Sequence, residues 1–203
     1  MISNGNTKIG AIPNFSLPAI KTCPGQTDFC PVFCYGLRGH FTHRSREAML
    51  ERNYRRSQQD NFVSRMIRSI QDNASLVFRI HVVGDFYSPQ YIQKWAEIVV
   101  ALPAVNFYGY TRSWRCPDLK EALDNLRSYP NCYLLASIDF THIDMPDASW
   151  NTVSVEGEGA PCPHDTEMIE TCLTCGLCWS GRVNLKLKVK WFSKRKNLSP
   201  LLI

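Results

Sequence analysis

The chain has 203 residues, of which 44% are apolar and 20% are charged, and its formal net charge is +5. This composition excludes a disordered chain, and the length excludes a complete eight-stranded α/β barrel, which needs roughly 250 residues. No segment approaches the ~18 apolar residues of a membrane span. The N-terminus lacks the basic start and apolar run of a secretory signal. We therefore expect a cytoplasmic, single-domain protein without a membrane partner.

The N-terminal segment, residues 1–42, is predicted to be an extended lead-in that contains a loop with three cysteines. Residues 1–22 are rich in Gly, Pro and Asn, and residues 23–37 place the cysteines between Pro and Gly, which is typical of loops. Apolar residues then recur at helical spacing over residues 43–72. They predict helical structure there, with a second helix that begins near Asn61.

Residues 43–156 are predicted to form an α/β core, in which strands and helices alternate. This order favours parallel strands joined by right-handed crossovers. Ser88-Pro89 and Cys116-Pro117 are typical helix starts, because proline suits the first helical turn. The predicted strands cover residues 77–83, 105–110 and 132–138, and residues 153–155 could add a fourth.

The C-terminal segment, residues 157–203, is predicted to hold a cysteine-rich loop, an edge strand and a basic tail. From Val183 to Trp191, apolar residues alternate with polar residues that are mostly lysines, which predicts a half-exposed strand whose lysines protect a sheet edge. The whole pattern predicts an α/β fold. We expect a compact partial barrel, or an open, mainly parallel sheet with flanking helices and cysteine-rich metal-binding loops.

Nine cysteines are present, and in a reducing compartment clustered cysteines indicate metal ligands rather than disulfides. Four of them form a C-x9-C-x2-C-x2-C pattern. Its C-x2-C-x2-C run places three thiolates on one short loop, as in bacterial ferredoxins. Zinc is the main alternative, but four-cysteine zinc sites usually use two separated C-x2-C pairs. The pattern predicts a [4Fe–4S] cluster held by Cys162, Cys172, Cys175 and Cys178.

The N-terminal cysteines Cys23, Cys30 and Cys34 form a C-x6-C-x3-C pattern with no fourth cysteine nearby. Three thiolates would leave one iron of a second [4Fe–4S] cluster open to a small molecule. A zinc site completed by His40 or His43, ordinary buried cysteines, and a cluster shared with the C-terminal group remain alternatives. The isolated Cys116 and Cys132 are interpreted as core or incidental residues.

Polar residues follow the predicted strands and would meet at the carboxyl edge of the sheet, where such folds bind ligands. Asp85 could accept a hydrogen bond from an amine, and Arg112 could bind a carboxylate or phosphate. Turns and helix caps also place polar residues after strands, which is the structural alternative. His81 is interpreted as a core histidine. The candidate ligand-binding residues are Gly84, Asp85, Arg112, Ser137 and Asp139, with Tyr87 and Trp114 as stacking surfaces.

Residues 38–68 contain eight arginines and three acidic residues. A basic helical face can bind the phosphates of a nucleic acid. A solvated face with scattered ion pairs is the more ordinary interpretation.

Several motifs resemble the phage gene product 88 family over nearly the whole chain. They are Asn6-Thr7-Lys8-Ile9-Gly10, Thr22-Cys23-Pro24-Gly25, Gly84-Asp85-Phe86-Tyr87-Ser88, Tyr110-Thr111-Arg112-Ser113-Trp114 and Cys172-Leu173-Thr174-Cys175-Gly176-Leu177-Cys178-Trp179. This resemblance implies a phage protein that acts in the cytoplasm of the infected host cell. It does not imply a particular activity.

A more distant resemblance is to radical S-adenosylmethionine enzymes that have a C-terminal auxiliary cluster. It rests on Phe33-Cys34, on Gly84-Asp85 after a strand, and on the C-terminal cysteines. It implies S-adenosylmethionine as a second cofactor. The N-terminal spacing departs from that family's usual C-x3-C-x2-C, and the chain offers fewer strands.

Three functions remain open from the sequence. The first is an iron–sulfur protein with a redox or electron-transfer role and a host redox protein as partner. The second is a small radical S-adenosylmethionine-type enzyme with a second, open-site cluster. The third is a zinc-stabilised nucleic-acid-binding module.

Overall fold

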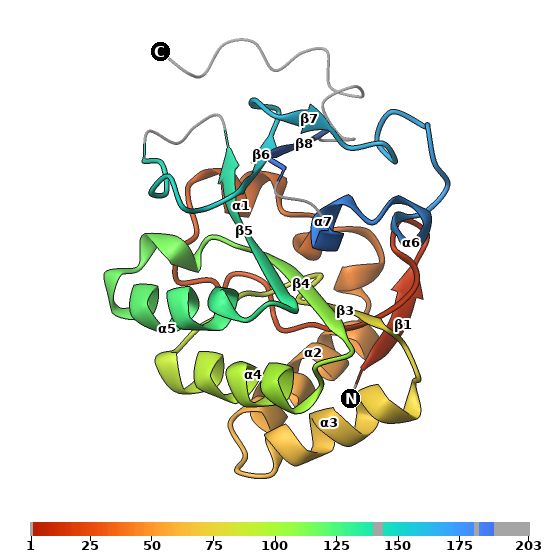
Figure 1. Cartoon of the computed structure of the whole chain (residues 1–203), viewed down its shortest axis with the longest axis vertical. Helices are drawn as coiled ribbons and strands as arrows, with labels where there is room; N and C mark the ends of the chain where they lie inside the picture. The colour runs from red at the N-terminus through yellow and green to blue at the C-terminus, as the bar shows by residue number, and fades with distance from the viewer. Residues whose placement is uncertain (1, 140–143, 181–182, 189–203) are drawn as a thin grey trace.

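The computed structural model describes residues 2–139, 144–180 and 183–188. Within them, one eight-stranded sheet has the order β1-β2-β3-β4-β5-β6-β8-β7 (Figure 1). Neighbouring strands are parallel except for β1 and β2. The strands are β1 (Ser3–Asn6), β2 (Gly10–Phe15), β3 (Val77–Ile80), β4 (Asn106–Thr111), β5 (Cys132–Asp139), β6 (Thr152–Val155), β7 (Ala160–Pro161) and β8 (Leu185–Leu187).

Four longer helices connect the first strands, and three short ones accompany the cysteines. The longer helices are α2 (Arg44–Ser57), α3 (Phe62–Asp72), α4 (Pro89–Ala101) and α5 (Pro117–Ser128). The short ones are α1 (Phe29–Phe33), α6 (Cys172–Cys175) and α7 (Leu177–Ser180), and single 3-10 turns occur at η1 (Tyr35–Leu37), η2 (Gly39–Thr42) and η3 (Ser113–Arg115).

Local sequence explains the helix starts well. Ser88 caps α4 by accepting a hydrogen bond from the backbone N–H of Tyr91 (3.2 Å), and Pro89 follows in the first turn. Pro117 lies in the first turn of α5, which has no side-chain cap. In α3, Phe62, Met66 and Ile70 recur at helical spacing and are all buried.

The two faces of the sheet carry separate apolar cores, because side chains alternate along each strand. In β3, Phe78 and Ile80 join the core beneath α3, α4 and α5, whereas Val77 joins the other. This second core also contains Ile9, Ile12, Tyr108, Leu135, Val153, Cys172, Cys178, Trp179 and Leu185. The C-terminal cysteine segment, with α6 and α7, therefore covers the face opposite the helical layer (Figure 1).

The expected α/β fold is confirmed in its open form, as a mostly parallel sheet with flanking helices. The prediction of an extended lead-in over residues 1–42 was incomplete, because β1 and β2 are part of the sheet and β2 pairs with β3. The expected edge strand was wrong in its position. β8 lies between β6 and β7, so its lysines do not border an open edge, and residues 189–191 lie outside the described residues. None of the described helices is long and apolar enough to cross a membrane.

Candidate metal centre and strand-end site

The four C-terminal cysteines line one pocket on the second face of the sheet. Its cavity volume is only about 10 Å³, so the lining side chains lie close together. Tyr110 from β4 and Leu185 from β8 form part of its wall. Cys162, Cys172 and Cys178 are buried, and Cys175 is half-buried. The structure thus brings the four C-terminal cysteines of the predicted ligand set to one place.

Backbone hydrogen bonds fix this cysteine segment to strands at both ends of the chain. The N–H of Cys172 donates to the carbonyl of Lys8, 2.8 Å away, which ties α6 to the turn before β2. The N–H of Cys162 donates to the carbonyl of Lys186 at 2.9 Å. Gly176 then reverses the chain between α6 and α7 with φ +74°, a conformation that favours glycine.

Burial and nearby polar groups act on these thiols in opposite directions. Burial raises the pKa of Cys172 to about 11 and also raises the pKa of Cys178. The hydroxyl of Tyr110 lies 2.9 Å from the sulfur of Cys178 and forms a hydrogen bond with it. That contact and the charge of Arg79 favour the thiolate of Cys178. A bound metal would displace the thiol protons, since the ligand is the thiolate.

A single metal ion and an iron–sulfur cluster require different arrangements of their ligands. Among the described residues, no group of three or more Cys, His, Asp or Glu side chains is arranged to hold one metal ion. A tetrahedral zinc needs its ligands to converge on one point. A [4Fe–4S] cluster binds each thiolate to a different iron, so its ligands have to line a pocket instead.

The N-terminal cysteine loop lies at the carboxyl edge of the sheet, between β2 and α2. Burial is the main cause that raises the pKa of Cys23, and the charges of Asp85, Cys34 and Cys30 add to it. The pKa of Cys34 is likewise raised by burial and by Cys30, while Arg112 lowers it. These electrostatic effects indicate that the three cysteines lie near one another. They also lie near Asp85 and Arg112, two of the predicted strand-end residues.

Asp85 is buried and acts as an acceptor for its own chain. Its carboxylate accepts hydrogen bonds from the hydroxyl of Thr111 and from the N–H groups of Phe86 and Arg112, each at 2.7 Å. Burial outweighs these bonds and raises the pKa of Asp85 to about 6. The carboxylate therefore holds the start of the turn after β4.

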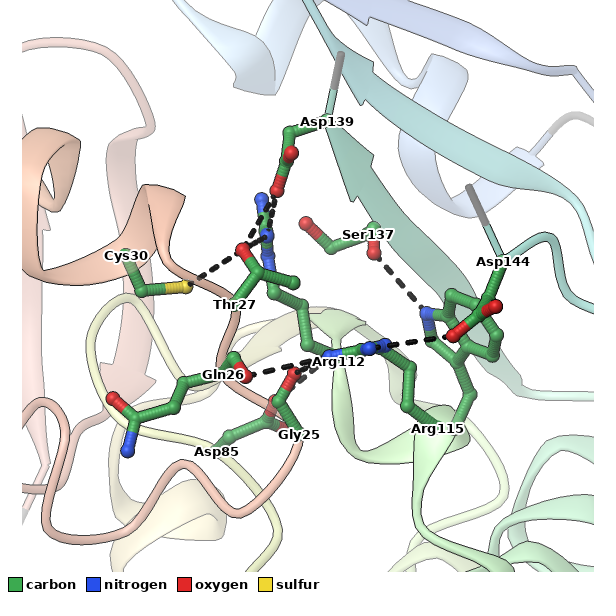
Figure 2. A network of polar contacts seen from close by, with 11 residues as sticks. Gly25, Gln26, Thr27, Cys30, Asp85, Arg112, Arg115, Ser137, Asp139 and Asp144 are labelled. Atoms are coloured by element: carbon green, nitrogen blue, oxygen red, sulfur yellow. Dashed lines mark hydrogen bonds and ion pairs between the residues drawn. The ribbon is translucent and has the colours of Figure 1, made fainter. Parts of the chain in front are cut away.

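Arg112 and Asp139 form the centre of a polar network that reaches the N-terminal loop (Figure 2). The guanidinium of Arg112 pairs with the carboxylate of Asp139 and donates to the hydroxyl of Thr27 at 2.7 Å. Thr27 in turn donates to Asp139 at 3.0 Å, and its oxygen lies 3.8 Å from the sulfur of Cys30. The carboxylate of Asp139 is fully buried, so the pair is shielded from water.

Close backbone contact completes the docking of this loop. A Cβ atom on Gly25 would lie 1.9 Å from the carbonyl oxygen of Arg112, so only glycine fits there. Arg115 donates to the carbonyls of Gly25 and Gln26 at 3.2 and 3.3 Å (Figure 2). The loop is therefore part of the framework at the carboxyl edge.

The other predicted strand-end residues have mainly structural surroundings. Gly84 has φ +81°, and a Cβ atom there would lie 2.5 Å from Leu17. The carbonyl of Ser137 accepts a hydrogen bond from the indole of Trp114 at 3.1 Å. Tyr87 stacks on Tyr91, with ring centroids 4.5 Å apart, and packs against the helix-side core.

His81 and Cys132 are core residues, in agreement with the sequence analysis. His81 is buried, and its Nε2 forms a hydrogen bond of 2.8 Å with the hydroxyl of Tyr91. Cys132 is in the helix-side core and Cys116 packs against it. His40 and His43 are exposed.

The basic stretch forms an exposed surface on α2 and α3. Within the described residues, no ion pair involves its five exposed arginines, Arg44, Arg52, Arg55, Arg65 and Arg68.

Sequence reasoning missed three residues that shape these sites: Arg79, Tyr110 and Thr27. Arg79 had a detectable signal, because it is a charged residue between two apolar residues of a predicted strand. Tyr110 and Thr27 had none, since each acts through a contact between segments far apart in the chain: Tyr110 with Cys178 and Thr27 with Asp139.

These features define a mixed α/β protein whose mostly parallel sheet is covered by helices on one face and by a cysteine-rich segment on the other. The family model described as "Gene product 88" matches residues 2–181, and the chain belongs to that family. This confirms the first resemblance.

Two curated relatives are both phage proteins, in agreement with the expected phage origin. The chain is 27% identical over 217 residues to the "Gene 88 protein" of Mycobacterium phage L5, an alignment that covers 89% of this chain and 88% of the relative. It is 26% identical over 213 residues to the "Gene 88 protein" of Mycobacterium phage D29, with coverage of 88% and 87%. No solved structure matches the chain significantly.

Proposed function

We propose that this phage protein binds a [4Fe–4S] cluster through Cys162, Cys172, Cys175 and Cys178, and that it transfers electrons in the infected host cell. The observation that carries the proposal is that these four cysteines line a single pocket. The cluster would supply a one-electron redox centre. A host redox protein would be the partner in this reaction.

The surroundings of the pocket support a redox centre. Trp179 is buried and packs against Tyr108, with ring centroids 4.9 Å apart, so it limits the access of water to one side. Tyr110 provides a hydrogen bond to one of the sulfurs. Hydrogen bonds to the sulfurs and exclusion of solvent are two of the factors that set the potential of a cluster.

The test is the content of iron, acid-labile sulfide and zinc in protein purified without oxygen. We expect about four irons and four sulfides per chain from the C-terminal site alone, and about eight of each if the N-terminal cysteines hold a second cluster. Cys175→Ala should lose the C-terminal share. Cys132→Ala, which changes a thiol outside the pocket, should keep it. Stoichiometric zinc without sulfide would contradict the proposal.

A second candidate function is that of a radical S-adenosylmethionine-type enzyme with an open-site cluster at Cys23, Cys30 and Cys34. The supporting observation is the position of these cysteines at the carboxyl edge of the sheet, beside Asp85 and Arg112. Because the oxygens of Asp85 already accept hydrogen bonds from the chain, its role there would be to hold the turn at Arg112.

Adding S-adenosylmethionine to the reduced protein tests this second function. We expect a changed electron-paramagnetic spectrum in the unmodified protein and no change in the Cys30→Ala variant. An unaltered spectrum at saturating S-adenosylmethionine would exclude the open site.

A third candidate is nucleic-acid binding by the exposed arginines of α2 and α3. Such binding would weaken steeply with salt, because each phosphate contact releases counterions. Binding that is absent, or that does not respond to salt, would exclude it.

A further inference from the structure

Arg79 is a buried cation on the face of the sheet that carries the C-terminal cysteines. It is only 7% exposed. Phe78 and Ile80, its neighbours in β3, point to the helix-side core, so Arg79 points to the opposite face. Its Nε donates to the carbonyl of His81 at 3.2 Å. A hydrogen bond to a neutral carbonyl does not neutralise the charge.

No carboxylate of the described residues forms an ion pair with Arg79. Two tyrosine rings lie close to it instead. Its Cζ is 4.5 Å from the ring centroid of Tyr110 and 5.5 Å from that of Tyr108. Ring faces attract a cation but carry no net charge, so the compensation is partial.

Tyr110 connects Arg79 with the cysteine pocket. The ring of Tyr110 stacks on Arg79, and its hydroxyl forms a hydrogen bond with the sulfur of Cys178. Arg79 interacts electrostatically with three tyrosines and with the thiols of Cys178 and Cys172. Tyrosines are neutral near pH 7, whereas a metal-bound cysteine is a thiolate.

We propose that Arg79 is the internal counter-charge of the C-terminal cysteine site, where it stabilises the bound cluster and makes the cluster easier to reduce. This inference rests on the proposed function. One-electron reduction by an external donor makes the cluster and its thiolates more negative by one charge. A fixed positive charge in a weakly screened interior therefore stabilises the reduced state more than the oxidised state.

The experiment is a redox titration of the purified holoprotein with dithionite, followed by absorbance and electron-paramagnetic resonance. Arg79→Met removes the charge and keeps much of the length, and we expect a midpoint potential more negative than that of the unmodified protein. Arg79→Lys keeps the charge and should shift the potential less. Arg68→Met removes an exposed charge on α3 and should leave the potential unchanged, since water and salt screen it.

A second measurement is the rate at which a chelator removes iron. Loss of the counter-charge should speed iron release in Arg79→Met but not in Arg79→Lys. If Arg79→Met does not fold, as judged by circular dichroism, Arg79→Gln carries the same expectation, because its amide can still donate to the His81 carbonyl.

The outcomes separate this inference from the proposed function. Absence of iron and sulfide in the unmodified protein would defeat both. A full complement of iron, together with an unmoved potential and an unchanged rate of iron release in the charge-removing variant, would defeat only the role of Arg79.

Discussion

At the scale of single residues, His81 links burial to pH. It follows β3 with φ +59°, an uncommon conformation for histidine, and its side chain is buried beside Tyr91. Burial, and then the charge of Arg79, lower the pKa of His81 from 6.5 to about 3. At pH values between about 3 and 6.5, His81 binds a proton more readily in the unfolded chain than in the folded protein. The neutral ring thus contributes stability above pH 6.5 that is lost as the pH falls towards 3.

The corresponding variant is His81→Gln, which cannot titrate in this range. We expect the free energy of unfolding of the unmodified protein to fall more steeply than that of the variant as the pH is lowered from about 7 to about 4. Urea denaturation at several pH values measures this difference. Asp85 acts in the opposite direction, because its raised pKa makes its contribution fade as the pH rises through about 6, but it is common to both proteins and cancels. Parallel pH profiles would contradict the assignment.

At the scale of elements, the buried pair of Arg112 and Asp139 joins the N-terminal cysteine loop to β5. We expect Asp139→Asn to lower the free energy of unfolding by about 3–5 kcal/mol, because it leaves the guanidinium buried without its counter-charge. Hydrogen exchange should rise over residues 23–34, where Thr27 loses a charged acceptor.

The matched control is Asp144→Asn, which removes the partner of Arg115 in an exposed ion pair of 3.4 Å. Exposed pairs contribute about 0–1 kcal/mol, so this variant should be close to the unmodified protein. Equal stability of the two variants would show that the buried pair does not anchor the loop. Urea denaturation of both proteins decides the question.

The elements that sequence reasoning identified correctly are those with local signals. Ser88 and Pro89 mark the start of α4 through the chain's own chemistry, and the alternation of strands and helices in the core follows from hydrophobic spacing. β2 has no such signal. It contains Pro13, and it becomes a strand through pairing with β3, where Asn14 is opposite Arg79. Long-range pairing of this kind is invisible in a local window of sequence.

In the candidate site, too, only the features with a local sequence signal were predictable. The spacing of the C-terminal cysteines indicated a shared site, and the structure places all four around one pocket. The position of the pocket was not predictable, because it depends on β7, a strand of only two residues that pairs with β8 and removes it from the edge. Nor does the sequence show that Tyr110 and Cys178 meet, since 68 residues separate them.

At the scale of the whole molecule, the two cores differ in what holds them. The helix-side core is built from long helices and contains none of the predicted metal ligands. The opposite core includes Cys172 and Cys178, and the segment that covers it has only two four-residue helices of its own. Helices of that length are not stable alone. The metal would therefore supply much of the folding free energy of that layer.

If the C-terminal cysteines hold the proposed cluster, its removal with a chelator should loosen one face of the sheet and spare the other. We expect faster hydrogen exchange and protease cleavage over residues 160–180, with protection of α3, α4 and α5 retained.

Trp179, which packs on Tyr108, should become exposed and shift its fluorescence to longer wavelength. Trp179→Phe should reduce this shift, because Trp95 and Trp150 lie in the helix-side core and Trp114 packs against it. If both faces instead lost protection together, the sheet and its two layers would be one cooperative unit whose stability depends on the metal throughout. If neither face changed, the cysteine segment would hold its place by packing alone.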